Sequence, residues 1–97
     1  MFTRKFKIPD YNWEVEMYDP TEEEAIVLGT AYDARDWSKV YSLLPNYITK
    51  WNCTDRQGTV LAIDTLGVAK LPSPALRWLV LAYFKAVYAE PKNTLAS

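Results

Sequence analysis

Apolar and polar residues alternate strictly across residues 13–18, near the start of the chain. The apolar positions fall on one side of an extended segment and are Trp13, Val15 and Met17. A period of two is typical of a strand with one buried face and one face in water. Residues 4–8 hold a shorter apolar pattern, and the intervening Pro9-Asp10 pair suits a turn. We therefore expect residues 4–8 and 13–18 to pair as a hairpin.

Two helices are predicted after this hairpin. Thr21 and Glu24 have the spacing of a capping box, and acids in the first turn suit the positive end of the helix dipole. Apolar residues at helical spacing then continue to about Tyr32. A second helix starts from Asp33 or Asp36 and is ended by Pro45-Asn46, and its apolar residues are Trp37, Val40, Tyr41 and Leu44.

The middle of the chain combines strand and turn signals. The segment 47–53 is rich in β-branched and aromatic residues, which favour a strand. Residues 54–58 have turn chemistry, with Gly58 available for a positive φ angle. Residues 59–63 are predicted to return as a short second strand.

Two further helices follow in the sequence. A short one is capped by Asp64-Thr65 and ends near residue 70. The last helix runs over residues 74–89, with Ser73 as its cap and a proline at its first position. Pro91 prevents this helix from continuing far.

These elements predict an α+β fold, in which a small antiparallel β-sheet packs against three or four helices and the C-terminal helix is long. A chain of 97 residues is short for more than one domain. We expect a single domain over residues 1–91 and a flexible C-terminal tail over residues 92–97. The pattern leaves the order of the strands open.

The last predicted helix carries more apolar surface than one core-facing stripe requires. A stripe of ordinary width contains Leu76, Leu79, Val80, Tyr83, Phe84 and Val87. The apolar residues outside this stripe are Trp78, Leu81 and Tyr88. Either the domain buries the helix on most sides, or these side chains form an exposed patch that binds another protein or another copy. Under the second interpretation the interface residues are Trp78, Leu81, Lys85 and Tyr88.

Composition excludes most catalytic schemes. The chain has no histidine, one cysteine (Cys53) and three glycines. It therefore lacks a histidine base, a cysteine-rich zinc site and a glycine-rich phosphate loop. Glu14 and Glu16 share a strand face, but alternating exposed acids are more typical of a solubilising surface than of a catalytic pair. We expect no enzymatic activity, no cofactor and no metal.

Charge is balanced in total but uneven along the chain. Eleven Lys and Arg against twelve Asp and Glu give a net charge of −1, which lacks the basic footprint of a nucleic-acid binder. Eight acids and no base lie between residues 8 and 34, whereas eight bases and four acids follow from Arg35 onward. These charges are either solvated faces or two poles of opposite sign that steer copies or partners together.

No targeting or membrane segment is predicted. A secretory signal requires an apolar region after the basic N-terminal residues, and none follows them. The longest apolar run, residues 78–84, is too short to cross a membrane. A lone cysteine without a signal fits a reducing cytoplasm. We therefore expect a cytoplasmic protein with neither a membrane nor a nucleic acid as its partner.

One segment in the second half of the chain combines a strand, a turn and a short helix. It reads Ile48-Thr49-Lys50-Trp51-Asn52-Cys53-Thr54-Asp55-Arg56-Gln57-Gly58, followed by Leu66, Leu71-Pro72 and an apolar helix. This order resembles a pattern in small proteins of tailed bacteriophages, grouped with siphophage tail assembly chaperones and other small tail or neck components. The similarity covers residues 48–88, and the chain departs from the pattern at Cys53 and at Thr59-Val60-Leu61.

The resemblance implies a non-enzymatic phage protein that acts through protein–protein contacts. A tail assembly chaperone would coat the phage tape measure protein in the host cytoplasm, and self-association into a homo-oligomer is expected. The first alternative is a structural component of the neck or tail, which would be found in the virion. The second is a host-directed inhibitor. The resemblance transfers no catalytic residue.

Overall fold

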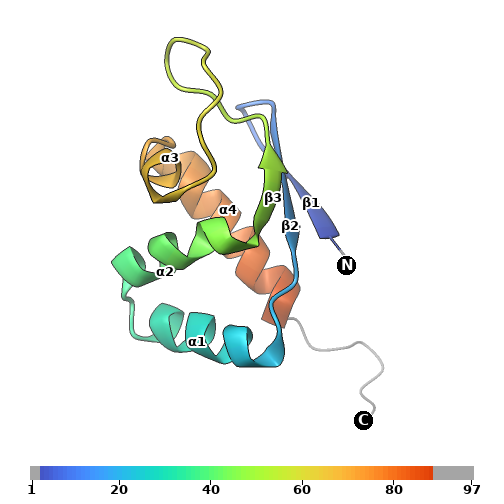
Figure 1. Ribbon diagram of the computed structural model, residues 1–97, viewed down its shortest axis with the longest axis vertical. Helices are drawn as coiled ribbons and strands as arrows, with labels where there is room; N and C mark the ends of the chain where they lie inside the picture. Colours follow the sequence, from blue (N-terminus) through green and yellow to red (C-terminus); the bar gives the residue numbers. More distant parts are fainter. Residues whose placement is uncertain (1–2, 89–97) are drawn as a thin grey trace.

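The predicted α+β fold is confirmed in the computed structural model, which describes residues 3–88 of the chain (Figure 1). Its elements are strands β1 (Thr3–Ile8) and β2 (Trp13–Tyr18), helices α1 (Glu22–Asp33) and α2 (Trp37–Leu43), the 3₁₀ helix η1 (Leu44–Tyr47), strand β3 (Ile48–Trp51), and helices α3 (Thr65–Ala69) and α4 (Ser73–Tyr88). The predicted tail, residues 92–97, and the predicted end of the last helix at residue 89 lie outside the described residues.

The three strands form one antiparallel sheet in the order β1-β2-β3. The expected hairpin is confirmed, and its register pairs Phe6 with Val15. Asp10 and Asn12 lie in its turn with φ angles of 72° and 57°, a left-handed conformation that aspartate and asparagine adopt more readily than most residues. Strand β3 adds to the other edge of β2, where Val15 pairs with Trp51. The helices all lie on one side of this sheet (Figure 1).

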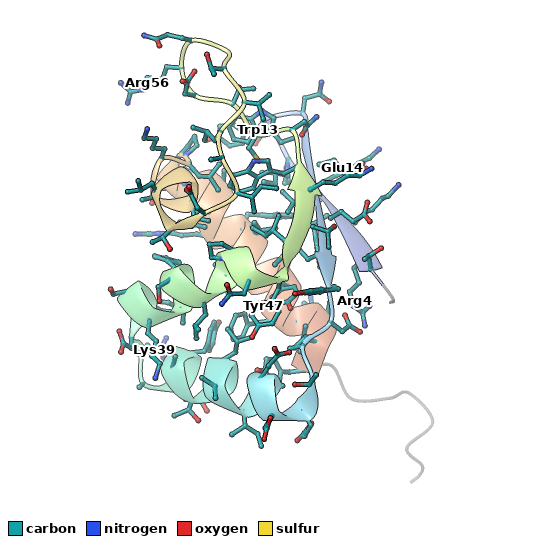
Figure 2. All side chains as sticks on the ribbon, viewed as in Figure 1. Arg4, Trp13, Glu14, Lys39, Tyr47 and Arg56 are labelled. Atoms are coloured by element: carbon teal, nitrogen blue, oxygen red, sulfur yellow. The ribbon has the colours of Figure 1, made fainter. Side chains whose placement is uncertain are left out.

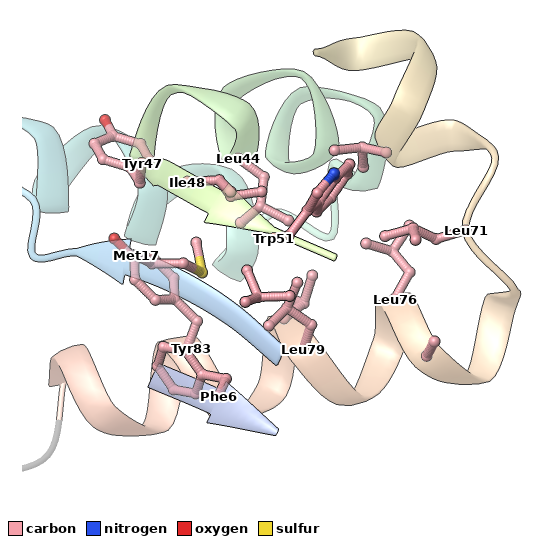
Figure 3. Packing of buried hydrophobic residues seen from close by; sticks show 14 of the residues in the cluster. Phe6, Met17, Leu44, Tyr47, Ile48, Trp51, Leu71, Leu76, Leu79 and Tyr83 are labelled. Atoms are coloured by element: carbon pink, nitrogen blue, oxygen red, sulfur yellow. The ribbon is translucent and has the colours of Figure 1, made fainter. Parts of the chain in front are cut away.

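Helix α4 packs against the sheet and forms the centre of the core (Figure 3). Figure 3 shows Tyr83 of α4 beside Phe6 of β1. The two rings meet edge to face, with centroids 6.0 Å apart and planes at 75°, and the Tyr83 hydroxyl donates a hydrogen bond to the carbonyl of Tyr18 at 3.0 Å. Only 1% of Tyr83 is exposed. This phenol therefore joins α4 to the sheet through both its apolar ring and its polar end.

The apolar stripe predicted for the last helix faces this core. Its buried members are Leu76, Leu79, Val80, Tyr83 and Phe84, while Val87 is half-buried. The helix begins at Ser73, one residue earlier than predicted, because the amide of Leu76 donates to the carbonyl of Pro72 at 3.0 Å. Ser73 is therefore the first helical residue.

Side-chain caps fix the starts of the other helices. The predicted capping box is present: the Glu24 amide donates to Thr21 Oγ1 at 3.2 Å, and the Thr21 amide donates to Glu24 Oε1 at 2.8 Å. Of the two aspartates considered for the second helix, Asp36 is the cap, because its carboxylate accepts from the amide of Lys39. Asp64 caps α3 through the amide of Gly67, at 2.7 Å.

The prediction of a strand over residues 59–63 is wrong. Within the described residues this segment makes a single isolated bridge, between Thr54 and Val60. Side chains take up the backbone groups that a ladder would use: Asp55 Oδ1 accepts from the amides of Gln57 and Thr59, and the indole N–H of Trp51 donates to the carbonyl of Leu61 at 2.8 Å. Such local bonds compete with strand pairing.

The strand predicted over residues 47–53 is shorter than expected. It is confined to Ile48–Trp51. At its start, Tyr47 belongs to the 3₁₀ helix η1, which begins at Leu44 and has Pro45 in its first turn. Figure 2 shows Tyr47 pointing in among the helices, and it is 5% exposed.

We predict that Gly67→Ala destabilises the fold by about 2–3 kcal/mol, as overpacking does. A Cβ atom at Gly67 would lie 1.8 Å from the backbone oxygen of Ala62, so the segment that crosses α3 must move. Urea unfolding measures this loss. Gly58→Ala is the matched control: it has a φ of 87° but open space around it, and we expect it to cost about 1 kcal/mol of backbone strain. Equal losses in the two variants would contradict the crowding at Gly67.

Candidate functional site

Three adjoining hollows run along the side of α4 that the sheet leaves uncovered. The first has a volume of about 390 Å³ and is lined by Tyr32, Arg35, Trp37, Tyr41, Arg77, Val80 and Leu81. The second has a volume of about 680 Å³ and is lined by Gly29, Tyr32, Asp33, Leu81, Phe84, Lys85 and Tyr88. The third has a volume of about 310 Å³ and is lined by Glu22, Ala25, Ile26, Gly29, Thr30, Asp33, Val87 and Tyr88.

The hollows share lining residues and therefore form one groove. Tyr32 and Leu81 belong to both the first and the second hollow, and the second and third share Gly29, Asp33 and Tyr88. One wall is α4, and the opposite wall is formed by α1 together with the start of α2. We call this surface the α1–α4 groove.

Aromatic rings in succession connect the two walls of the α1–α4 groove. Tyr88 stacks on Phe84 with centroids 5.5 Å apart, and Phe84 stacks on Tyr32 at 4.4 Å. Trp37 then meets Tyr32 edge to face at 5.4 Å and stacks on Tyr41 at 6.4 Å. Aromatic pairs in these geometries gain free energy beyond their buried area. The rings therefore hold α1, α2 and α4 in a fixed arrangement beneath the groove.

Tyr88 fastens the end of α4 to α1. Its hydroxyl donates a hydrogen bond to the carbonyl of Ala25. Gly29 makes room for this contact, because a Cβ at that position would lie 3.3 Å from the Tyr88 hydroxyl oxygen. Burial raises the pKa of the Tyr88 hydroxyl, and the negative charges of Asp33 and Glu22 raise it further, against an opposing backbone hydrogen bond at Gly29. The phenol is therefore neutral at physiological pH and acts as a donor.

The structure brings three of the four predicted interface residues together. Leu81 is 57% exposed and Tyr88 is 43% exposed, and both line the groove with the exposed Lys85. Trp78 is half-buried, packs against the core and is not among the lining residues. It stands about 60° around the helix from Leu81, since each residue turns a helix by about 100°.

The opposite wall contains lining residues that sequence reasoning missed. They are Tyr32, Arg35, Trp37 and Tyr41. Tyr32, Trp37 and Tyr41 were assigned to the apolar faces of their own helices, and nothing in the helical period says that those faces meet α4. The one signal in the sequence is Trp37, a large aromatic residue that directly follows the cap Asp36. In the structure Trp37 is 37% exposed.

Charge changes sign along the α1–α4 groove. Arg35 and Arg77 line the first hollow, which we call the basic end. Glu22 and Asp33 line the third hollow, the acidic end. Lys85 lies in the middle hollow together with Asp33, so the centre of the groove carries both signs. The uneven charge noted along the sequence is thus partly gathered into one surface.

Arg35 occupies a backbone position that usually belongs to glycine. Its φ is 59°, and it follows α1 in a Schellman motif: the amide of Arg35 donates to Tyr32, and the amide of Asp36 donates to Ala31. A left-handed conformation costs a residue with a Cβ about 1–2 kcal/mol. The chain thus places a guanidinium at the groove at a cost in stability, and strain of this kind clusters at functional sites.

The other candidate groups lie away from the groove. Cys53 is fully buried, and burial raises the pKa of its thiol to about 12. Glu14 points away from the helices on the outer face of the sheet (Figure 2), and Glu16 lies 3.9 Å from Lys50 Nζ in an ion pair. Residues 3–88 contain no cluster of three or more potential metal ligands.

A second group of exposed apolar side chains lies at the far end of the molecule from α1 (Figure 1). It belongs to the loop after β3 and to α3, and consists of Val60, Ile63 and Leu66. None of the three lines the groove. In the part of the chain that the structure describes, no helix has the length and apolar character needed to cross a bilayer.

Comparison of the chain with protein-family models, curated proteins and solved structures found no match.

We predict that Arg35→Gly raises the free energy of unfolding by about 1 kcal/mol, because glycine adopts a positive φ without strain. Thermal unfolding followed by circular dichroism measures the gain. Arg35→Ala is the matched control, since it also removes the guanidinium but keeps the Cβ and its strain. Equal melting temperatures for the two variants would show that the backbone conformation costs nothing.

We predict that the Cys53 thiol reacts with an aromatic disulfide reagent only when the protein unfolds. An unfolded cysteine ionises with a pKa of about 8.5, whereas burial holds the pKa of Cys53 at about 12 in the fold. The unfolded state therefore loses this proton first, and stability should fall as pH rises above about 8.5. Reaction rates at several urea concentrations check the prediction. Rapid labelling in the native state would contradict it.

Proposed function

We propose that this chain is a non-enzymatic protein that works by binding another protein in the α1–α4 groove. The observation that carries the proposal is Leu81, which stands 57% exposed in the centre of a groove with aromatic walls. Exposed apolar surface on a small domain commonly marks an interface. Leu81 is bordered by Tyr32 and Tyr88, and tyrosine is a frequent anchor where one protein meets another.

The shape of the groove suits an extended or helical segment of a protein partner. Its three hollows follow the length of α4 from Arg77 to Tyr88, and hydrophobic grooves of this kind accept the apolar face of a helix. The rings beneath it are already stacked on one another, so binding requires little ordering of the receptor. Preorganised surfaces keep more of the contact energy as affinity.

The biological role that we propose is assistance in phage tail assembly, with the tape measure protein as the partner. The support for this role is the resemblance of residues 48–88 to small tail proteins, since a chaperone that coats an extended tape measure protein needs exposed apolar surface of the kind found in the groove. The chain also contains no histidine, which agrees with a protein that binds rather than catalyses.

We predict that Leu81→Glu abolishes co-purification of the tape measure protein co-expressed with this chain. A partner that binds in the groove would have to remove water from this carboxylate, and burying an unpaired charge costs free energy and weakens binding. Folding should be unaffected, because substitutions at exposed positions usually change stability by less than about 0.5 kcal/mol. Pull-down from co-expressing cells, with a melting curve of each variant, makes the measurement.

Leu66→Glu is the matched control, since Leu66 is 72% exposed on α3 and lies outside the groove. It should leave co-purification intact. Binding that survives Leu81→Glu, or is lost equally in both variants, contradicts the groove as the site. Mass spectrometry of purified virions separates the roles: a chaperone is absent from them, and a structural subunit is present.

A further inference from the structure

The α1–α4 groove is complementary to itself. Its basic end holds Arg35 and Arg77, and its acidic end holds Glu22 and Asp33. Rotating a second copy by half a turn about an axis through the middle hollow brings the basic end of each copy onto the acidic end of the other. A two-fold interface requires a surface of this kind, in which a patch on one copy matches a different patch on the second.

Apolar residues follow the same symmetry. Trp37, 37% exposed, lies at the basic end, and Ile26, 59% exposed, lies at the acidic end. Leu81 lies between them, in the first and middle hollows. The half-turn that pairs the charges therefore also places Trp37 against Ile26 of the second copy, and the two Leu81 side chains near each other. Charge and apolar contacts specify the same arrangement.

The middle of the groove tolerates this rotation. Lys85 and Asp33 line the same hollow, so the region nearest the axis carries both signs of charge. Each Lys85 meets a surface that contains the other copy's carboxylate as well as its ammonium group. Opposite charges at both ends set the register, while juxtaposed like charges exclude the parallel arrangement.

We propose that the occupant of the α1–α4 groove in the free protein is a second copy of this chain, docked by a half-turn with α4 of each copy lying along the groove of the other. This inference rests on the proposed function only in treating the groove as a protein-binding surface. A client that enters the groove would displace the second copy, so dimerisation and client binding compete.

A charge-swap experiment tests the pairing of the ends. Sedimentation equilibrium of the full chain should show a reversible dimer that weakens with added salt. Arg35→Glu with Arg77→Glu makes both ends acidic, and Glu22→Lys with Asp33→Lys makes both ends basic. Each double variant alone should dimerise at least about tenfold more weakly. An equimolar mixture of the two should regain a dimer, because every acidic end then meets a basic one. Circular dichroism establishes that both variants fold.

A disulfide experiment tests the position of the axis. Leu81→Cys should give a covalent dimer on mild oxidation, since two residues close to a two-fold axis come within disulfide reach. Leu66→Cys, at a position that is even more exposed at 72% but lies on α3, should not. The buried Cys53 is the same in both variants and does not take part.

The outcomes decide between occupants of the groove. A wild-type monomer at all concentrations, or a dimer that neither reversal weakens, overturns the proposal. Oligomers that grow beyond the dimer also overturn it, because they require a head-to-tail contact. A monomer that still captures the tape measure protein refutes the dimer and leaves the proposed function standing. A charge-dependent dimer that never binds the tape measure protein supports the dimer and refutes the proposed function.

Discussion

The packing of α4 against the β1–β2 hairpin is the contact that organises the fold. Tyr83 is its centre: the ring lies against Phe6, and the hydroxyl satisfies the carbonyl at the end of β2. Burial among apolar side chains raises the pKa of this phenol, so it stays a neutral hydrogen-bond donor. Once this side of α4 is covered, the remaining helices must arrange themselves around its other sides.

Those helices are too short to cover α4 completely. Helix α2 has seven residues and α3 has five, and α3 is already engaged beneath the loop at Ala62. Helix α1 reaches α4 through the stacking of Tyr32 on Phe84 and through the hydroxyl of Tyr88. The side of α4 between these contacts keeps Leu81 in the open. The groove is therefore a consequence of how little chain is available to cover a long apolar helix.

Strain and charge support the proposal that this opening binds a partner. A glycine at position 35 would end α1 without the cost of a left-handed arginine, yet the chain keeps a guanidinium there. It lines the same hollow as Arg77, while the carboxylates gather at the opposite end of the groove. A surface that served only to keep the protein in solution would not require this ordering of signs. It suits a role in which the groove selects the orientation of what it binds.

Elements with local signals could be predicted from the order of the amino acids alone. Alternation gave the hairpin, the Thr21–Glu24 capping box gave the start of α1, and the spacing of apolar residues gave the buried stripe of α4. Periods and caps depend on residues a few positions apart, so they can be identified in the chain alone. Local signals gave a wrong prediction at residues 59–63, where β-branched residues favour a strand. In the structure the side chains of Asp55 and Trp51 bind the backbone there and hold it in a loop.

Whether the surplus apolar surface of α4 is covered depends instead on how the helices pack in three dimensions. The sequence placed Trp78, Leu81 and Tyr88 outside the core stripe but could not say which of them another element would cover. The fold half-buries Trp78 and leaves Leu81 exposed in the groove. It also brings Arg35 from the end of α1 to Arg77 on α4. Such meetings join residues far apart in the chain, and their geometry follows from how helices pack, which no local spacing encodes.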